Sequence, residues 1–309
     1  FFQAEDGIRD SVAARGLGDV YKRQLLNLAR LLRSDQADVL AANKLDYQEA
    51  KSEGLEESML DRLLLTNDRL NSTADEIERV AELPDPIGEV IEASSLPNGL
   101  VTSRRRVPLG VVGSIYESRP NVTIDVFGLC LKSGNACILR GGKETIRSNT
   151  TLYAMIRKAL SDAGVTVDAV QFVDNPDRRL VDAMLKMDSY IDLLVPRGGS
   201  SLVKFVAENA TMPAVTGGIG VCHTYVDRSA DLTMAAEIVH NAKVRRPSIC
   251  NALDTVLVHA EVAAEGLPMI AKGLTASGVE LRCDNRSLSI LGPEGSDGTI
   301  PANEDDWGR

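Results

Sequence analysis

Residues 110–139 read GVVGSIYESRPNVTIDVFGLCLKSGNACIL, and this stretch decides the fold. It holds an apolar run at 110–115, a helical pattern at 122–132 and a second apolar run at 136–139. Short apolar strands with a helix between them pair in parallel through a crossover. The alternation continues with helical patterns at 145–163, 177–186, 200–208 and 231–242, and with apolar runs at 170–173, 190–195 and 221–226. The sequence therefore predicts an open α/β sheet of parallel strands with helices on both faces, and ligands beyond the carboxyl ends of its strands.

Composition shifts divide the chain further. Residues 1–24 show no helical or strand period and do not begin with Met, so we expect a non-native or disordered leader; the alternative is a divergent extension. Residues 25–247 form the predicted cofactor domain, with packing helices at its start and an edge hairpin arm near 99–109. A new strand-helix-strand unit opens the second, catalytic α/β domain, predicted at 248–309 and incomplete there.

The overall composition is that of a globular protein without a nucleic-acid partner. The chain has 309 residues, of which 44% are hydrophobic and 25% charged, and a net charge of -10 that no basic stripe offsets. Its apolar runs are strand-sized and no secretory pattern is present, so we expect a cytoplasmic protein without membrane contact. Five cysteines without CxxC spacing and three histidines without partners at ligand spacing predict neither a disulfide framework nor a metal site.

One cysteine lies in a distinctive setting. Residues 241–255 read NAKVRRPSICNALDT, a polar loop between a helical pattern and an apolar run, with Cys250 near its middle. Nearby cations, which are Lys243, Arg245 and Arg246, would favour its thiolate. Cys250 is therefore a candidate nucleophile, although a structural or incidental cysteine is the more common case. The remaining cysteines, Cys222 among them, are interpreted as core residues or bystanders.

Three stretches carry a resemblance to a known family. They are residues 106–122, RVPLGVVGSIYESRPNV; residues 213–223, PAVTGGIGVCH; and residues 241–251, NAKVRRPSICN. From about residue 25 to residue 309 the chain resembles the gamma-glutamyl phosphate reductases, a proline-biosynthesis family of the aldehyde dehydrogenase superfamily. The resemblance implies an aldehyde dehydrogenase-like fold whose first domain binds NADP. It also implies reduction of L-glutamyl 5-phosphate by NADPH to L-glutamate 5-semialdehyde. In this reaction phosphate is released and a thioester on Cys250 is the intermediate.

Other functions stay open beside this one. They are another acylating aldehyde dehydrogenase and an inactive NADP-binding fragment, since the family continues further at its C-terminus. An ATP-binding kinase is disfavoured because no phosphate loop is present. The resemblance further implies a homo-oligomer in the full-length protein and a possible coupling to glutamate 5-kinase.

Two strand ends are candidate cofactor sites, although no GxGxxG motif is present. Gly198, Gly199 and Ser200 open a helix whose free N–H groups suit a phosphate, and the resemblance places the cofactor pyrophosphate there. A plain strand-to-helix turn is the alternative. Arg140 and Lys143 follow the neighbouring strand, and two cations there favour the 2′-phosphate of NADPH. The alternative is a solvated basic turn.

The substrate side is predicted after the strand at 110–115. Asn121 or nearby backbone can face a developing oxyanion, and Arg119 can face a phosphate or carboxylate. Ser118 lies where many superfamily members have an oxyanion-binding Asn, which leaves the donor open. Lys243, Arg245 and Arg246 would bind the anionic ends of the substrate or lower the thiol pKa. The sequence has no carboxylate between Glu208 and Asp227, where hydrolytic members place a water-activating Glu, so we expect phosphate as the acyl acceptor.

Overall fold

The computed structural model describes residues 18–162, 165–217, 220–247, 249–292 and 298–306. The chain forms two compact units, Phe1–Gly217 and Gly218–Arg309, and each is described by itself. The division comes before the strand at 222–226, ahead of residue 248, where the sequence analysis begins the second domain. Of the predicted leader, residues 1–17 lie outside the described residues. Residues 18–24 belong to a helix in which Tyr21 is buried, so this part of the predicted leader is ordered and packed.

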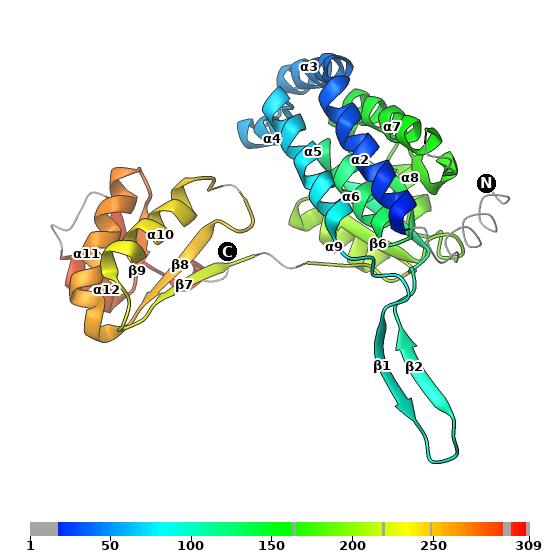
Figure 1. Cartoon of the computed structure of the whole chain (residues 1–309). Coiled ribbons are helices and arrows are strands. Elements are labelled where there is room, and N and C mark those ends of the chain that lie inside the picture. Colours follow the sequence, from blue (N-terminus) through cyan, green and yellow to red (C-terminus); the bar gives the residue numbers. More distant parts are fainter. Residues whose placement is uncertain (1–17, 163–164, 218–219, 248, 293–297, 307–309) are drawn as a thin grey trace. The chain divides into compact units, whose positions relative to one another are not determined.

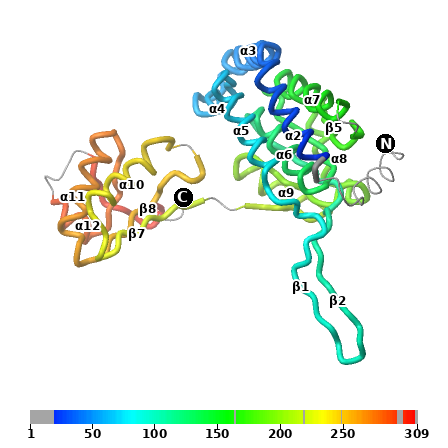
Figure 2. The backbone as a smooth tube through the Cα atoms, in the orientation of Figure 1, coloured from blue at the N-terminus to red at the C-terminus, as the bar shows by residue number. Residues whose placement is uncertain are grey.

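Helices form the first layer of the first unit. They are α2 (Gly18–Ser34), α3 (Gln36–Ser52), α4 (Glu57–Leu63) and α5 (Asn67–Glu82). Helix α2 packs against α5, and it also contacts two helices that cover the sheet (Figure 2). Leu25, Leu28, Leu70 and Ile77 are fully or almost fully buried in this layer. The predicted packing helices at the start of the domain are therefore present.

A four-stranded parallel sheet forms the centre of the first unit (Figure 1). Its order is β5-β4-β3-β6, with bounds β3 (Val111–Tyr116), β4 (Ala136–Arg140), β5 (Val170–Phe172) and β6 (Leu193–Arg197). The connecting helices are α6 (Asn121–Lys132), η1 (Lys143–Thr145), α7 (Ile146–Ser161), η2 (Val167–Ala169), α8 (Arg179–Met184) and α9 (Ser200–Asn209).

Side chains of β3 alternate between the two faces of this sheet. Val112 and Tyr116 belong to the large core shared with α2, α5, α6 and α7, whereas Ile115 belongs to the smaller core beneath α8 and α9. Gly113 lies against Leu194 on that second face. Helices therefore cover both faces, as the alternation of the sequence predicts.

The strand predicted at 221–226 is not part of this sheet. It forms β7 (Cys222–Val226), which pairs in parallel with β8 (Leu253–Val258) in the second unit. The pairing is explained by the core of that unit, where Val226 packs with Val239, Leu253 and other apolar residues. The remaining elements are α10 (Leu232–Val244), α11 (Ala260–Ala276), β9 (Leu281–Cys283), α12 (Asn285–Leu291), β10 (Thr299–Pro301) and η3 (Glu304–Asp306), and β9 pairs in parallel with β10.

The predicted hairpin arm is present but begins earlier in the chain. Strands β1 (Val90–Ser95) and β2 (Val101–Arg105) pair antiparallel, so the arm lies at residues 90–105 rather than 99–109. Every residue of the two strands is exposed, and the hairpin extends away from the helices of the first unit (Figure 1). In the part of the chain that the structure describes, no helix is long and apolar enough to cross a membrane.

Candidate active site

Three strand ends of the first unit meet at one edge of the sheet. Ile115 is in register with Arg140, and Tyr116 is in register with Arg197, because β3 lies between β4 and β6. The segments that follow these strands hold the predicted cofactor residues and, after β3, the predicted Arg119 and Asn121. The sheet thus brings these residues of the first unit to the edge where open α/β sheets bind ligands.

The glycine turn after β6 already binds an anionic oxygen. Gly199 is the N-cap of α9 and Ser200 is its first residue, and the Gly199 N–H donates to Glu117 Oε2 over 2.9 Å. A Cβ at Gly198 would collide with the same carboxylate. The turn therefore offers the close backbone approach and the N–H donor that a pyrophosphate requires. In this structure, that N–H donates to Glu117, a residue to which no sequence pattern assigned a role.

Arg140 is a buried cation with an unused donor. Its side chain lies at the end of β4, and Nη2 donates to the carbonyl oxygen of Pro176 over 2.9 Å. Nε is buried and has no hydrogen-bond partner among the described residues. Burial is the main cause that lowers the pKa of Arg140. A buried donor without a partner is costly, and a phosphate oxygen would satisfy it, so this residue fits a phosphorylated cofactor.

Lys143 differs from Arg140 in its surroundings. It is exposed on η1, and its Nζ lies 2.8 Å from Glu53 Oε2 at the end of α3. The hydrogen bond to Glu53 is the largest cause that raises the pKa of Lys143. The structure therefore places Arg140 at the end of β4 and Lys143 just after it, with Lys143 already in an ion pair.

A chain of buried hydrogen bonds fixes the loop between these two cations. Tyr116 Oη lies 2.7 Å from Thr123 Oγ1, and Thr123 Oγ1 donates to Asn149 Oδ1 over 2.9 Å. Asn149 Nδ2 then donates to Thr145 Oγ1, which donates to the carbonyl oxygen of Gly142. All four side chains are fully buried. Because the network is satisfied internally, it holds Gly142 in one position relative to β3 and α6.

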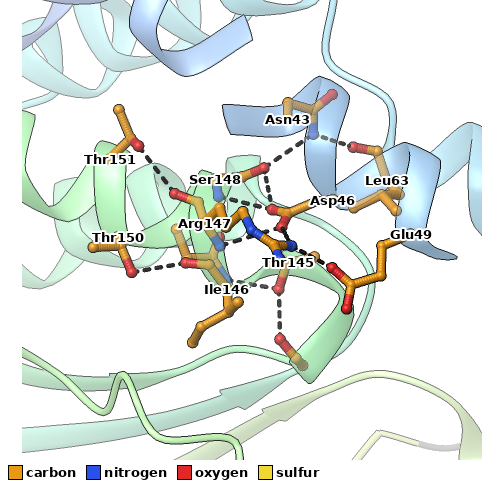
Figure 3. Close-up of polar contacts among 12 residues, drawn as sticks. Asn43, Asp46, Glu49, Leu63, Thr145, Ile146, Arg147, Ser148, Thr150 and Thr151 are labelled. Atoms are coloured by element: carbon orange, nitrogen blue, oxygen red, sulfur yellow. Dashed lines mark hydrogen bonds and ion pairs between the residues drawn. The ribbon is translucent and has the colours of Figure 1, made fainter. Parts of the chain in front are cut away.

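A second polar network fixes the start of α7 (Figure 3). Asp46 Oδ2 on α3 accepts from Ser148 N over 2.8 Å and from Ser148 Oγ over 2.6 Å, and Asp46 Oδ1 accepts from Arg147 N over 3.3 Å. Asn43 Nδ2 donates to Ser148 Oγ and to the carbonyl oxygen of Leu63. A carboxylate at a helix N-terminus stabilises that end, so Asp46 anchors the helix that follows the cofactor loop.

Ser118 links the substrate segment to the cofactor loop. It is buried and adopts a φ of 46°, a left-handed conformation that a non-glycine residue rarely takes. Its N–H and its hydroxyl both donate to Glu144 Oε1, over 2.6 and 2.8 Å. The Ser118 hydroxyl therefore donates to Glu144, a residue to which no sequence pattern assigned a role.

Asn121 is the first residue of α6, and its amide contacts a carboxyl group one turn later. Asn121 Nδ2 lies 3.0 Å from Asp125 Oδ2. Burial raises the pKa of Asp125 to about 7, the negative charge of Glu76 adds to that shift, and the Asn121 hydrogen bond and Arg197 oppose it. Arg119 lies two residues before Asn121, and its carbonyl oxygen accepts from the N–H of Val122. The predicted oxyanion donor is thus held by a partly buried carboxyl group.

The predicted nucleophile lies in the second unit, between α10 and β8. Cys250 is exposed on a turn, and Ala252 N donates to the carbonyl oxygen of Ile249 over 3.0 Å. Lys243 lies in the last turn of α10 with its Nζ 3.8 Å from Asp254 Oδ1. Arg245 and Arg246 are exposed directly after that helix. The structure therefore confines the thiol and the three predicted cations to one loop and the helix end before it.

Cys222, which the sequence leaves as a core residue or bystander, lies against the same loop. Its Sγ contacts the carbonyl oxygen of Cys250 over 3.5 Å, and its N–H donates to Asp254 Oδ2 over 3.1 Å. The backbone of Gly220 also approaches this carbonyl, since a Cβ on Gly220 would lie 2.7 Å from the Cys250 oxygen. Sequence spacing gave no signal for this contact, because it depends on the pairing of β7 with β8.

The described residues hold no group of three or more His, Cys, Asp or Glu side chains that could bind a metal ion. The arrangement offers other chemistry. The first unit presents N–H donors and a buried guanidinium suited to phosphate groups. The second presents an exposed thiol on the loop that follows the helix end bearing Lys243.

Comparison with known proteins gives the class of protein first. A sequence model of the aldehyde dehydrogenase family matches residues 25–288, and the chain belongs to this family. Within it, the chain is similar to gamma-glutamyl phosphate reductases. It is 54% identical to that of Roseiflexus castenholzii over 282 residues and 50% identical to one of Dehalococcoides mccartyi over 285 residues. These alignments cover 91% and 92% of the chain and 67% of each relative.

A solved structure agrees with these relatives. The gamma-glutamyl phosphate reductase of Thermotoga maritima is 39% identical, with a TM-score of 0.87, over 99% of this chain and 73% of that one. The predicted family and the predicted aldehyde dehydrogenase-like α/β fold are thereby confirmed. The chain spans about two thirds of the length of the two bacterial relatives.

Proposed function

We propose that this chain carries the reductase chemistry of its relatives: NADPH-dependent reduction of L-glutamyl 5-phosphate to L-glutamate 5-semialdehyde, with release of phosphate, in proline biosynthesis. The observation that carries the proposal is the 54% identity to a gamma-glutamyl phosphate reductase over 282 residues. The exposed Cys250 beside a cationic helix end supports it independently, because acyl transfer to a thiol needs an accessible thiolate.

Cys250 is the proposed nucleophile. Its thiolate attacks the acyl carbon of the substrate, phosphate leaves with the bonding electrons, and a thioester joins the glutamyl group to Sγ. The cations Lys243, Arg245 and Arg246 stabilise the thiolate and bind the anionic ends of the substrate. Lys243 also pairs with Asp254, so we assign it mainly to the thiolate loop and assign the more exposed arginines to the substrate.

The proposed cofactor site lies at the strand ends of the first unit. Gly198, Gly199 and Ser200 would hold the pyrophosphate, with the carboxylate of Glu117 withdrawn from the Gly199 N–H. Arg140 and Lys143 would hold the 2′-phosphate, and the unpartnered Nε of Arg140 supports this assignment. NADPH, when bound, supplies the hydride for the thioester carbonyl.

The remaining proposed roles concern the oxyanion. The Asn121 amide stabilises the oxygen that becomes negative as the thiohemiacetal forms, and Arg119 binds an anionic group of the substrate. Collapse of the thiohemiacetal releases the semialdehyde and returns the Cys250 thiolate. Because no carboxylate occurs between Glu208 and Asp227, water is a poor acyl acceptor and phosphate serves instead in the reverse direction.

The proposal is tested by the phosphate-dependent reduction of NADP+ with glutamate 5-semialdehyde. Cys250→Ser should abolish the reaction while NADPH still binds, as measured by fluorescence titration. Cys283→Ser is the matched control, because Cys283 lies on β9, which pairs with β10 and not with the strand after this loop, and it should keep the activity. Turnover in Cys250→Ser would contradict the assignment.

A second candidate is an NADP-binding chain without turnover of its own. The 67% coverage of the relatives favours keeping it, because residues of the remaining third could complete the site. NADPH binding by the wild-type chain without any semialdehyde oxidation would establish this candidate. Assembly into a homo-oligomer through the exposed arm at 90–105, coupling to glutamate 5-kinase and a cytoplasmic location are further proposals that rest on the resemblance.

A further inference from the structure

We propose that Cys222 and Cys250 form a reversible disulfide, with Cys222 as the thiol that resolves an oxidised Cys250. This site of modification is separate from the reductase chemistry proposed above. The two cysteines are 28 residues apart in the sequence, and the parallel pairing of β7 with β8 places them together.

The contact between the two residues is direct. Cys222 Sγ lies 3.5 Å from the carbonyl oxygen of Cys250. The C=O and Cα–C bonds total about 2.8 Å, so Cys222 Sγ lies at most about 6.3 Å from Cα of Cys250. That Cα bears the side chain whose thiol must be reached. Because Cys250 is exposed on a turn, rotation about its Cα–Cβ bond can direct its Sγ toward Cys222, and the proposed S–S bond forms from that rotamer.

Both thiols are accessible to a small oxidant, and the other three cysteines are either buried or have a raised pKa. Cys250 is exposed and Cys222 is partly exposed. Cys130 and Cys137 are buried in the core of the first unit. Cys283 is partly exposed, but burial raises its pKa, which lowers its thiolate fraction. The chain therefore contains one pair suited to oxidation and three cysteines that serve as internal controls.

The chemistry needs hydrogen peroxide as the oxidant. The Cys250 thiolate attacks one peroxide oxygen, the O–O bond breaks, and hydroxide leaves while Cys250 becomes a sulfenic acid. Cys222 Sγ then attacks the Cys250 sulfur, the S–O bond breaks, and the S–S bond forms. The departing hydroxide takes the thiol proton and leaves as water. The two sulfurs lose two electrons in total, and one peroxide is reduced to one water and one hydroxide, which becomes a second water with the proton that Cys250 released on ionising.

The disulfide has a defined consequence for the proposed nucleophile. A sulfenic acid without a nearby thiol is oxidised further to a sulfinic acid, which thiol reductants do not reverse. A disulfide with Cys222 stops the oxidation at a stage that dithiothreitol reverses. While it persists, Cys250 cannot form a thioester.

The experiment treats the purified chain with stepwise additions of hydrogen peroxide and maps its tryptic peptides without reductant. The two cysteines lie on separate peptides, residues 205–228 and 246–272, and Cys283 lies on a third, so a Cys222–Cys250 bond appears as one linked pair. We expect that pair as the main early product and its complete loss with dithiothreitol.

Cys222→Ser decides between the disulfide and independent oxidation. In this variant Cys250 should pass to the sulfinic acid, with at least a several-fold larger fraction that dithiothreitol does not restore. Cys283→Ser should form the linked pair as wild type does. Equal sulfinic acid in wild type and Cys222→Ser, or linkage of either thiol to Cys283, would overturn the proposal. Since the mapping uses neither cofactor nor substrate, its failure would leave the reductase proposal untouched.

Discussion

The cofactor edge of the first unit and the thiol loop of the second are built in opposite ways. Around the cofactor edge, fully buried side chains such as Thr123, Thr145 and Asn149 hold one another by hydrogen bonds. In the loop that holds Cys250, the side chains of Arg245, Arg246, Cys250 and Asn251 are exposed, although Ala252 and Leu253 behind them are buried. The difference indicates that the chain fixes its phosphate-binding groups in advance and leaves its nucleophile accessible to a reactant.

The largest expected effect is the loss of aldehyde oxidation when no phosphate is present to accept the acyl group from Cys250. Without phosphate or arsenate, steady reduction of NADP+ by glutamate 5-semialdehyde should fall by roughly a hundredfold or more, because no carboxylate between Glu208 and Asp227 activates water as a general base. Absorbance at the NADPH band measures the rate in acceptor-free buffer. A steady rate equal to that with phosphate would show that water reaches the thioester unaided.

Substitution of Asp46 tests the buried hydrogen-bond network at the start of α7. Asp46→Ala leaves the N–H groups of Arg147 and Ser148 without their acceptor, so we expect a loss of about 3 kcal/mol in the free energy of unfolding. Glu49→Ala is the control, because Glu49 forms an exposed ion pair with the same arginine and should cost less than about 1 kcal/mol. Urea unfolding followed by circular dichroism measures both. Equal losses would contradict the assigned role of Asp46.

Asp125 gives the cofactor edge a pH dependence. Its pKa is raised to about 7 in the folded state. The stabilisation of the folded state by protonated Asp125 is therefore complete at low pH, and it declines as pH rises from about 4 to about 7. Over that range, wild type should lose roughly 2–4 kcal/mol of unfolding free energy relative to Asp125→Asn, which cannot ionise. Urea unfolding of both proteins at several pH values tests the sign. If the unfolding free energies of the two proteins changed in parallel with pH, Asp125 would not be the source of the pH dependence.

The smallest expected effect concerns the preference for NADPH over NADH, and it comes from the exposed Lys143 rather than the buried Arg140. Lys143→Glu should weaken the binding of NADPH more than that of NADH, because a charge-assisted contact to the 2′-phosphate is lost. Glu53→Gln is the matched variant, since it removes the carboxylate that now pairs with Lys143 and should shift the preference toward NADPH. Fluorescence titration measures both affinities. Equal losses for the two cofactors in Lys143→Glu would show that this lysine does not read the phosphate.

Much of the fold was predictable because local patterns set it. The alternation of apolar runs and helical patterns in 110–208 gives the parallel sheet and its two covered faces. The strand at 222–226 continues that alternation but pairs elsewhere, since the partner of a strand depends on long-range packing that periodicity does not report. The hairpin shows the same limit, because its first strand, 90–95, is fully exposed and lacks the apolar alternation of a half-buried strand.

The candidate site was predictable where a residue type carries its own chemistry. A cysteine beside three cations and a glycine pair before a helix can be identified in a sequence. Glu117, Glu144 and Cys222 cannot, because their importance lies in contacts with residues 26 to 82 positions away. Such contacts exist only after the strands have paired.

The most direct test of the central claim, that the exposed thiol of Cys250 is the acyl carrier, is mass spectrometry of the enzyme quenched during reaction. The chain is mixed with glutamate 5-semialdehyde and NADP+ in phosphate-free buffer, so that the thioester accumulates for want of an acceptor. We predict one glutamyl group per chain, on the tryptic peptide of residues 246–272, and its loss when phosphate is added. A glutamyl group on Cys222 or Cys283, or continued NADPH formation with Cys250 unmodified, would contradict the account.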